Sequence, residues 1–90
     1  MKPVKRDKTF EKHFKKRIIP HSKLTRQFED RFIRFVTNEK GTPLNDHELS
    51  GELAGKRAFS ITGDIRVVYV ELENAYIFLD IGTHNQVYGR

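Results

Sequence analysis

Histidine and arginine side chains in the second half of this sequence are the groups best suited to chemistry. His84 follows a Gly-Thr pair at the end of an apolar stretch, which places it just past a predicted strand. His47 and Arg57 lie in the polar segment 44–57, and they join a site at the sheet end if that segment folds over it. Histidine exchanges protons near neutral pH, and arginine offers fixed charge and planar donors to phosphate oxygens. These residue types suit proton transfer beside an anionic group.

Apolar stretches in the last third of the chain predict the strands that position these groups. Residues 65–70 are rich in β-branched and aromatic types and carry apolar side chains on both faces, so we expect this strand to be covered at least in part on both sides. Flanking strands are expected at residues 57–61 and 75–81, with turns at 62–64 and 71–74. The pattern predicts a three-stranded antiparallel meander.

Two helices are expected before the meander. Thr9 is the predicted N-cap of the first helix, which ends before Pro20, and Ser22 is the predicted N-cap of the second. Gly41 and Pro43 are the predicted stop signals of the second helix. Apolar residues with helical spacing in the two helices are Phe10, Phe14, Leu24, Phe28, Phe32, Phe35 and Val36. We expect these Phe-rich faces to form the core against one side of the meander, and residues 2–7 to form an edge strand or a loose terminus.

The length and composition predict a single small domain, residues 1–90, in the cytoplasm. Ninety residues allow one core, and no apolar run approaches the roughly 20 residues that span a bilayer. The start of the chain lacks the apolar segment of a signal peptide, and the absence of cysteine agrees with a reducing compartment. The four histidines show no HExxH or paired-ligand spacing, so we expect neither a metal nor another cofactor.

The charge is unevenly distributed along the chain. Residues 1–45 hold 13 Lys/Arg and 5 Asp/Glu, whereas residues 46–90 hold 4 and 7. A basic half favours a polyanion or an acidic protein as partner, although lysine-rich helices are often only solvated faces.

Three motifs, in order, carry a resemblance to a known family. They are Asp46-His47-x-Leu49-x-Gly51-x-Leu53-x-Gly55-x-Arg57, then Gly63-Asp64-x-Arg66-Val67-Val68-Tyr69, and finally Ile81-Gly82-Thr83-His84 with Tyr88. Together they resemble the RelE/ParE toxin superfamily of bacterial toxin–antitoxin systems, and within it the RelE/YafQ type. The resemblance is carried by residues 44–88, and across the helices it rests only on their order and length.

This resemblance implies an α+β fold in which two N-terminal helices pack on a twisted antiparallel β-sheet, in the order βααβββ. It also implies a type II toxin that is a ribosome-dependent, metal-independent endoribonuclease. Such an enzyme cleaves mRNA in the ribosomal A site by attack of a 2′-hydroxyl on the adjacent phosphate. The implied partners are the ribosome with its rRNA, the mRNA, and a cognate antitoxin that neutralises the toxin, with no role for a membrane.

The resemblance also implies the site residues. The catalytic set is His84, His47, Asp64, Arg66 and Arg57, and Tyr88 is expected to stack on a splayed base. We expect His84 to be the general acid, His47 or Asp64 the base, and the arginines to stabilise the transition state. Ser60 stands where YafQ-like members carry another histidine, and Ile65 where they carry an aromatic residue, which leaves the division of acid and base roles open.

The cations of the helices complete the expected site. The cations expected to bind ribosomal RNA are Lys12, Lys15, Lys16, Arg17, Lys23 and Arg26. Simpler interpretations stand beside these roles. Asp64 is first a turn former, Arg57 could pair with Glu52, and Arg66 could cover the outer sheet face or pair with Glu71 or Asp80. His13 and His21 look like surface residues.

Two other functions are compatible with the same fold. The first is a ParE-like toxin that inhibits DNA gyrase without cutting RNA, and such a protein does not need the convergent set of His47, Asp64, Arg66 and His84. The second is an inactive member that only binds an antitoxin, for which the serine at position 60 is the sole support.

Overall fold

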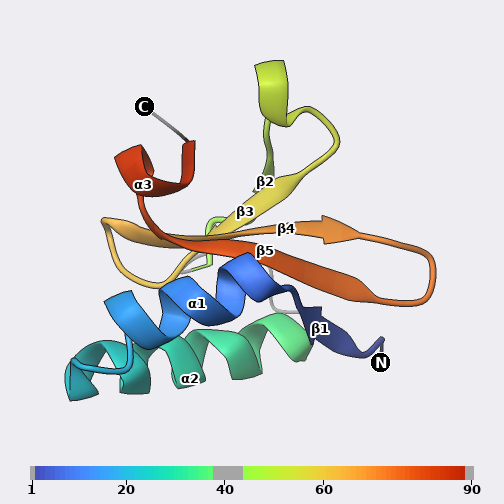
Figure 1. Ribbon diagram of the computed structural model, residues 1–90. Coiled ribbons are helices and arrows are strands. Elements are labelled where there is room, and N and C mark those ends of the chain that lie inside the picture. The colour runs from blue at the N-terminus through green and yellow to red at the C-terminus, as the bar shows by residue number, and fades with distance from the viewer. Residues whose placement is uncertain (1, 38–43, 89–90) are drawn as a thin grey trace.

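The structure, a computed structural model, describes residues 2–37 and 44–88 (Figure 1). Its elements are β1 (Val4–Arg6), α1 (Lys8–Arg17), α2 (Ser22–Val36), β2 (His47–Glu48), a 3-10 turn (Gly51–Leu53), β3 (Arg57–Ser60), β4 (Ile65–Glu71), β5 (Tyr76–Thr83) and α3 (His84–Tyr88). The expected α+β class is confirmed, with β2 and α3 as additions. Within the described residues, no helix has the length and apolar character needed to cross a membrane.

The strands form a five-stranded sheet in the order β1-β5-β4-β3-β2. The predicted antiparallel meander is confirmed as β3, β4 and β5. The sheet is mixed rather than wholly antiparallel, because β1 pairs with β5 in parallel. Parallel neighbours need a long crossover connection, which the intervening helices and strands supply here. The N-terminal segment therefore forms an edge strand instead of a loose terminus, which were the two alternatives expected from the sequence.

A bulge in β5 decides which of its residues face the core. Val68 pairs with Asp80, and the next residue, Tyr69, pairs with Phe78, so Leu79 is the extra residue of β5. Side chains alternate along a regular strand, and one extra residue reverses that alternation. Phe78 and Ile81 can therefore both be fully buried although they are three positions apart.

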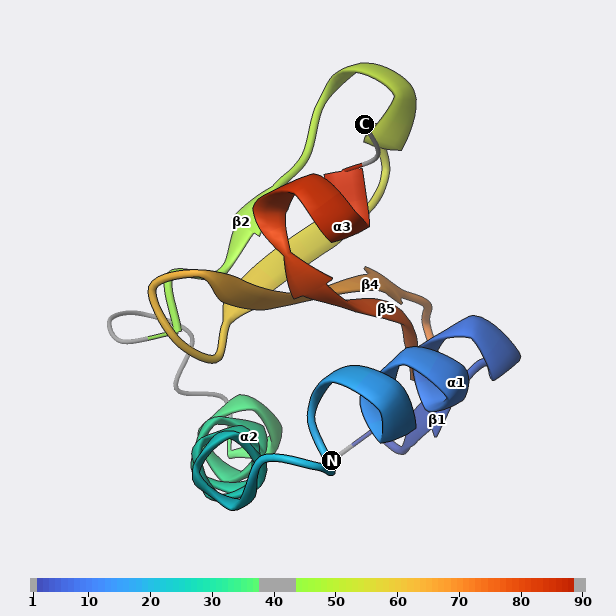
Figure 2. The ribbon, with the colours of Figure 1, turned by 60° about the vertical axis from the view of Figure 1, so that its left-hand side comes forward.

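The helices α1 and α2 cover one face of the sheet (Figure 2). The expected phenylalanine core is confirmed, since Phe10, Phe28 and Phe35 are buried and the partly buried Phe14 and Phe32 pack against the same cluster. On the other face, α3 lies above the sheet in Figure 1, on the same side as the 3-10 turn. The sheet thus separates a helical layer from a second, thinner layer.

Both predicted N-caps are wrong by one or two positions in the sequence. The N–H of Phe10 donates to Asp7 Oδ1 at 2.9 Å, so Asp7 caps α1 instead of Thr9. Ser22 is already the first residue of α2, and His21 occupies the cap without a side-chain hydrogen bond. Helix α2 ends at Val36 with Thr37 as its C-cap, and the predicted stop signals Gly41 and Pro43 lie outside the described residues.

Candidate functional site

Strand pairing brings two of the predicted catalytic residues to one face of the sheet. Arg66 pairs with Ser60 on one side and with Gly82 on the other, and His47 pairs with Ala58. Residues 58 and 60 share one face of β3, because side chains alternate along a strand. This face lies opposite the one that carries the buried Phe59, so His47, Ser60 and Arg66 all lie on the side away from the helical layer.

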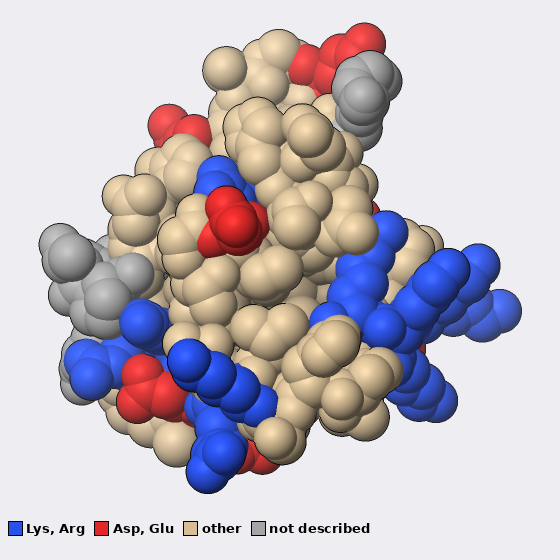
Figure 3. Space-filling model, turned by 90° about the vertical axis from the view of Figure 1, so that its left-hand side faces the viewer, with Lys and Arg blue, Asp and Glu red and all other residues tan. Residues whose placement is uncertain are grey.

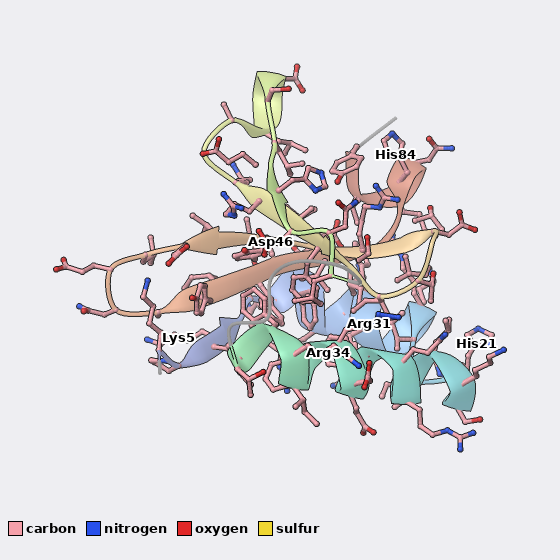
Figure 4. The ribbon with its side chains drawn as sticks, turned by 180° about the vertical axis from the view of Figure 1, so that it is seen from behind. Lys5, His21, Arg31, Arg34, Asp46 and His84 are labelled. Carbon is pink, nitrogen blue, oxygen red and sulfur yellow. The ribbon has the colours of Figure 1, made fainter. Side chains whose placement is uncertain are left out.

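Helix α3 places His84 and Tyr88 beside Arg66. Thr83 and Gln86 form a reciprocal cap at its start, with the N–H of Thr83 donating to Gln86 Oε1 and the N–H of Gln86 donating to Thr83 Oγ1. The rings of His84 and Tyr88, one turn apart, meet edge to face with centroids 4.5 Å apart. The Arg66 guanidinium carbon lies 5.7 Å from the centre of the Tyr88 ring. Figure 4 shows His84 projecting from α3 on the side away from α2.

An open hollow of about 520 Å³ lies between α3 and the segment before β3. Its walls include His84, Val87 and Tyr88 from α3 and Leu49 and Leu53 from that segment. The two leucines are half-buried, and Leu44 is fully buried in the core, so these leucines hold the segment against the rest of the protein. The hollow exposes His84 to solvent and gives a second molecule access to its imidazole.

Two polar atoms of this region lack a partner among the described residues. They are Arg66 Nε and the Tyr88 hydroxyl, both of which are buried. Buried polar groups are nearly always hydrogen-bonded, so each unpaired group is a candidate for contact with a ligand. Arg66 also donates from Nη2 to the carbonyl of Gly63 at 3.3 Å, which holds its guanidinium near the β3–β4 turn. Arg66 therefore lies on the outer sheet face with part of its donor set free.

His47 is held in one orientation by the backbone. Its Nδ1 lies 2.8 Å from the carbonyl oxygen of Asn45, and that residue has a left-handed φ of 51°. A carbonyl oxygen can only accept, so Nδ1 carries a proton in this hydrogen bond. In the neutral ring Nε2 then keeps its lone pair, and this nitrogen can accept a proton.

The structure does not bring Arg57 to Arg66. Arg57 pairs with Tyr69 across β3 and β4, on the face that carries the core, and donates to Asp46 Oδ1 from Nε at 2.8 Å and Nη2 at 2.7 Å. The Tyr69 hydroxyl donates to the other oxygen of Asp46, whose side chain is 1% exposed. The suggested pairing of Arg57 with Glu52 is thus wrong. The hydrogen bond to Asp46 raises the pKa of Arg57, and burial raises the pKa of Tyr69.

Asp64 lies exposed in the turn between β3 and β4. The turn is held by Thr62 Oγ1, which accepts from the N–H groups of Asp64 and Ile65 at 3.1 and 3.0 Å. The expected turn is confirmed. Asp64 extends from the same turn that receives the Arg66 guanidinium at Gly63.

Two residues of α1 are tied to the sheet rather than free. Asp80 accepts from His13 Nδ1 at 2.6 Å and lies 3.6 Å from Arg17 Nη1, which also donates to the carbonyl of Ile81 at 2.8 Å. His13 is therefore half-buried and paired instead of a free surface residue, whereas His21 is exposed as expected. Asp80 therefore pairs with His13 and Arg17 of α1, and the suggested pairing of Arg66 with Asp80 is wrong.

The remaining predicted RNA-binding cations are exposed on the helical layer. They are Lys12, Lys15, Lys16, Lys23 and Arg26. Figure 3 shows Lys and Arg gathered over α1 and α2, while the upper part of the same face is mostly uncharged or acidic. Within residues 2–37 and 44–88, no three His, Cys, Asp or Glu side chains are grouped so that they could hold a metal ion.

Comparisons with known proteins give one family match and several fold matches. The family described as "Bacterial toxin of type II toxin-antitoxin system, YafQ" matches residues 2–89. YafQ from E. coli strain BL21(DE3) has a TM-score of 0.82 at 19% identity, over 99% of this chain and 100% of that one. YafQ in the E. coli DinJ–YafQ complex has a TM-score of 0.81 at 20% identity, with the same shares covered.

A more distant fold match extends to another toxin group. A YoeB/ParE toxin from Agrobacterium tumefaciens has a TM-score of 0.75 at 15% identity, over 93% of this chain and 99% of that one. A search of curated protein sequences finds no match.

Proposed function

Because this chain belongs to the YafQ family of bacterial toxins of type II toxin–antitoxin systems, we propose that it is a ribosome-dependent endoribonuclease that cuts mRNA in the A site. The observation that carries this proposal is the cluster of His84, Tyr88 and Arg66, with His47 on the same face of the sheet. It combines two proton-transfer groups, a cation and an aromatic ring on one side of the sheet, with His84 and Tyr88 at the open hollow.

The proposed reaction is attack of a 2′-hydroxyl on the adjacent phosphate. His47 is the base, because its backbone hydrogen bond leaves Nε2 able to take the hydroxyl proton. His84, exposed at the hollow, is the acid that protonates the departing 5′-oxygen. Arg66 stabilises the charge of the phosphorane, and Tyr88 stacks on a nucleotide base. Asp64 is the alternative base, since it lies on the turn that Arg66 contacts.

Arg57 receives a different role from the one implied by the resemblance. Its guanidinium is committed to the buried carboxylate of Asp46, the residue directly before His47. We therefore assign Arg57 to positioning: it holds the entry to β2, and with it His47, instead of contacting the phosphate. Arg17 likewise holds α1 to β5 through the carbonyl of Ile81.

The proposed partners follow from the charge distribution and from the relatives. The exposed cations on α1 and α2 bind ribosomal RNA, because dispersed Lys and Arg neutralise phosphates without reading sequence. A cognate antitoxin silences the toxin, as the solved complex of a relative with DinJ supports. Its action on ribosomes would place the protein in the cytoplasm.

Primer extension on an mRNA in programmed ribosomes tests the proposal, with His84→Ala compared against wild type. His21→Ala is the matched control, because His21 is exposed at the start of α2 and lies far from His84 (Figure 4). Wild type and His21→Ala are expected to give discrete A-site cuts, and His84→Ala to lose about 100-fold or more of the rate.

Two results would overturn parts of this proposal. Full cleavage by His84→Ala would remove His84 from the catalytic set while leaving the nuclease in place. Intact mRNA with wild type, despite arrested growth, would contradict the enzyme itself. DNA gyrase supercoiling would then be the next assay, because the fold is shared with a YoeB/ParE toxin and does not separate the two activities.

A further inference from the structure

A second hollow, of about 300 Å³, opens between α2 and the turn that joins β3 to β4. Its polar lining consists of Arg31, Asn45, Ser60, Thr62 and Arg66. We propose that this hollow, named here the Arg31 pocket, binds a backbone phosphate of the RNA strand that is cut at His84. The inference rests on the proposed nuclease function and adds a binding site to it.

The Arg31 pocket contains two guanidinium groups with unused donors. Arg31 Nε and Arg66 Nε are both buried and have no hydrogen-bond partner among the described residues. Among the described residues, the carboxylate nearest to Arg31 Nε is Asp30 Oδ2 at 3.7 Å, which is too long for a hydrogen bond. Asp30 also pairs with Arg34 at 3.2 Å. Buried donors without acceptors are costly, so an incoming anion whose oxygens accept from these groups is favoured.

The other groups of the pocket also favour an anion. Thr62 Oγ1 already accepts two backbone N–H groups, which leaves its hydroxyl proton to donate. Ser60 and Asn45 add a hydroxyl and an amide, and no carboxylate lines the pocket within the described residues. A lining of donors and two positive charges matches the oxygens of a phosphodiester.

The pocket is also connected on both sides to other parts of the proposed site. Arg66 is shared with the catalytic cluster, where it lies over the Tyr88 ring. Arg31 is shared with a further hollow of about 460 Å³ on α2, which is also lined by the cations Lys23 and Arg26 and by one carboxylate, Asp30. Figure 4 shows Arg31 on the side of α2 that faces the sheet. Successive phosphates of one strand can thus run from the catalytic cluster through the Arg31 pocket to the cations of α2, which favours a polynucleotide over a free anion.

Binding of a short single-stranded RNA, blocked against cleavage by 2′-O-methylation, tests the pocket by fluorescence anisotropy over a range of salt concentrations. Arg31→Gln is expected to weaken binding about fivefold or more and to lower the salt slope by about 0.7, the value for one phosphate contact. Lys5→Gln is the matched control, because it removes the same charge from the exposed Lys5 on β1, away from the pocket. It is expected to leave the slope unchanged.

Equal losses of affinity and slope in both variants would show that only net charge matters, and would overturn the pocket. The absence of binding by wild type at low salt would do the same. NMR of the arginine Nε–H groups in wild type gives an independent answer that does not depend on how the variants fold. The signals of Arg31 and Arg66 are expected to shift on addition of the RNA, and unchanged signals contradict the proposal.

Ribosomal cleavage, measured separately, distinguishes this inference from the proposed function. If wild type cuts mRNA but Arg31→Gln binds RNA as wild type does, the pocket fails and the nuclease stands. If wild type leaves ribosomal mRNA intact but Arg31→Gln lowers RNA binding as expected, the nuclease fails and the pocket remains as an RNA-binding site.

Discussion

The carboxylate of Asp46 connects the core to the candidate site. It accepts from Arg57 and from the Tyr69 hydroxyl, and its side chain is almost fully buried. Removing one partner of a buried charged group leaves that charge uncompensated. The loss of stability is then much larger than when an exposed ion pair is broken. The next residue after Asp46 is His47, the proposed base and the first residue of β2. The hydrogen bonds of Asp46 therefore also fix the position at which β2 begins.

Tyr69→Phe is expected to lower the free energy of unfolding at pH 8 by about 1–3 kcal/mol, because Asp46 loses a donor in a buried place. In the wild type, burial raises the pKa of Tyr69 above its ordinary value of 10. Above about pH 10 the unfolded chain therefore loses the Tyr69 proton while the native state retains it. The contribution of Tyr69 to wild-type stability is complete below about pH 10. Above about pH 10 the free energy of unfolding falls by up to about 1.4 kcal/mol per pH unit.

Urea denaturation of both proteins between pH 8 and pH 12 measures this effect. The stability gap between wild type and Tyr69→Phe is expected to narrow as the pH rises above 10, since the variant has no phenol at this position. A gap that stays constant to pH 12 would contradict the raised pKa of Tyr69.

At the scale of elements, the junction of β5 and α3 orients the catalytic cluster. Gly82 pairs with Arg66, and it directly precedes the Thr83–Gln86 cap that starts α3. A Cβ at Gly82 would lie 2.6 Å from both Arg17 Nη1 and Gln86 Oε1. A side chain at position 82 would therefore displace the ends of Arg17 and Gln86, which hydrogen-bond to Ile81 and Thr83 at this point.

Gly82→Ala is expected to destabilise the protein by about 1–3 kcal/mol, because Arg17 and Gln86 must move away from their hydrogen-bond partners. It is also expected to slow ribosomal cleavage, since α3 carries His84. Gly63→Ala is the control: a Cβ there meets no atom within 4 Å, and its effect should stay within about 0.5 kcal/mol. Urea denaturation and primer extension measure the two effects, and equal stabilities of the two variants would argue against the crowding at Gly82.

At the scale of the whole molecule, an aromatic core joins the helical layer to the sheet. The ring of Phe35 in α2 lies within 5.5 Å, between centroids, of those of Phe59, Tyr69, Tyr76 and Phe78. Small domains bury a limited share of their surface, so a residue with this many partners carries a large part of the stability. The same packing holds α2, which carries Arg31, against the sheet.

Phe35→Ala is expected to cost about 3–5 kcal/mol, because it leaves a cavity among the surrounding rings. That is a large fraction of the roughly 5–15 kcal/mol that stabilises a typical domain. Ile33→Ala on the same helix is the control, since Ile33 is 59% exposed and should change stability by less than about 0.5 kcal/mol. Thermal unfolding followed by circular dichroism compares the two, and a similar melting temperature for both would contradict the central place of Phe35.

The sequence by itself determined the helices, the meander and the residues of the core. Alternating β-branched residues, polar turns and apolar residues at helical spacing are local signals, and each is read within one segment. The ordered motifs around His47, Arg66 and His84 also pointed to the correct family. The catalytic roles of these residues stay predictions.

Only the tertiary structure decided which segments distant in the sequence meet. The parallel pairing of β1 with β5, the contact of His13 with Asp80, and the pairing of Arg57 with the buried Asp46 all join segments that are distant in the sequence. Strand β2 and helix α3 are too short to show a period, so no local pattern marks them. Arg31 has the sequence context of an ordinary surface cation, and only the packing of α2 beneath the β3–β4 turn buries its Nε. Contacts of this kind depend on how whole elements pack, and no single stretch of sequence contains that information.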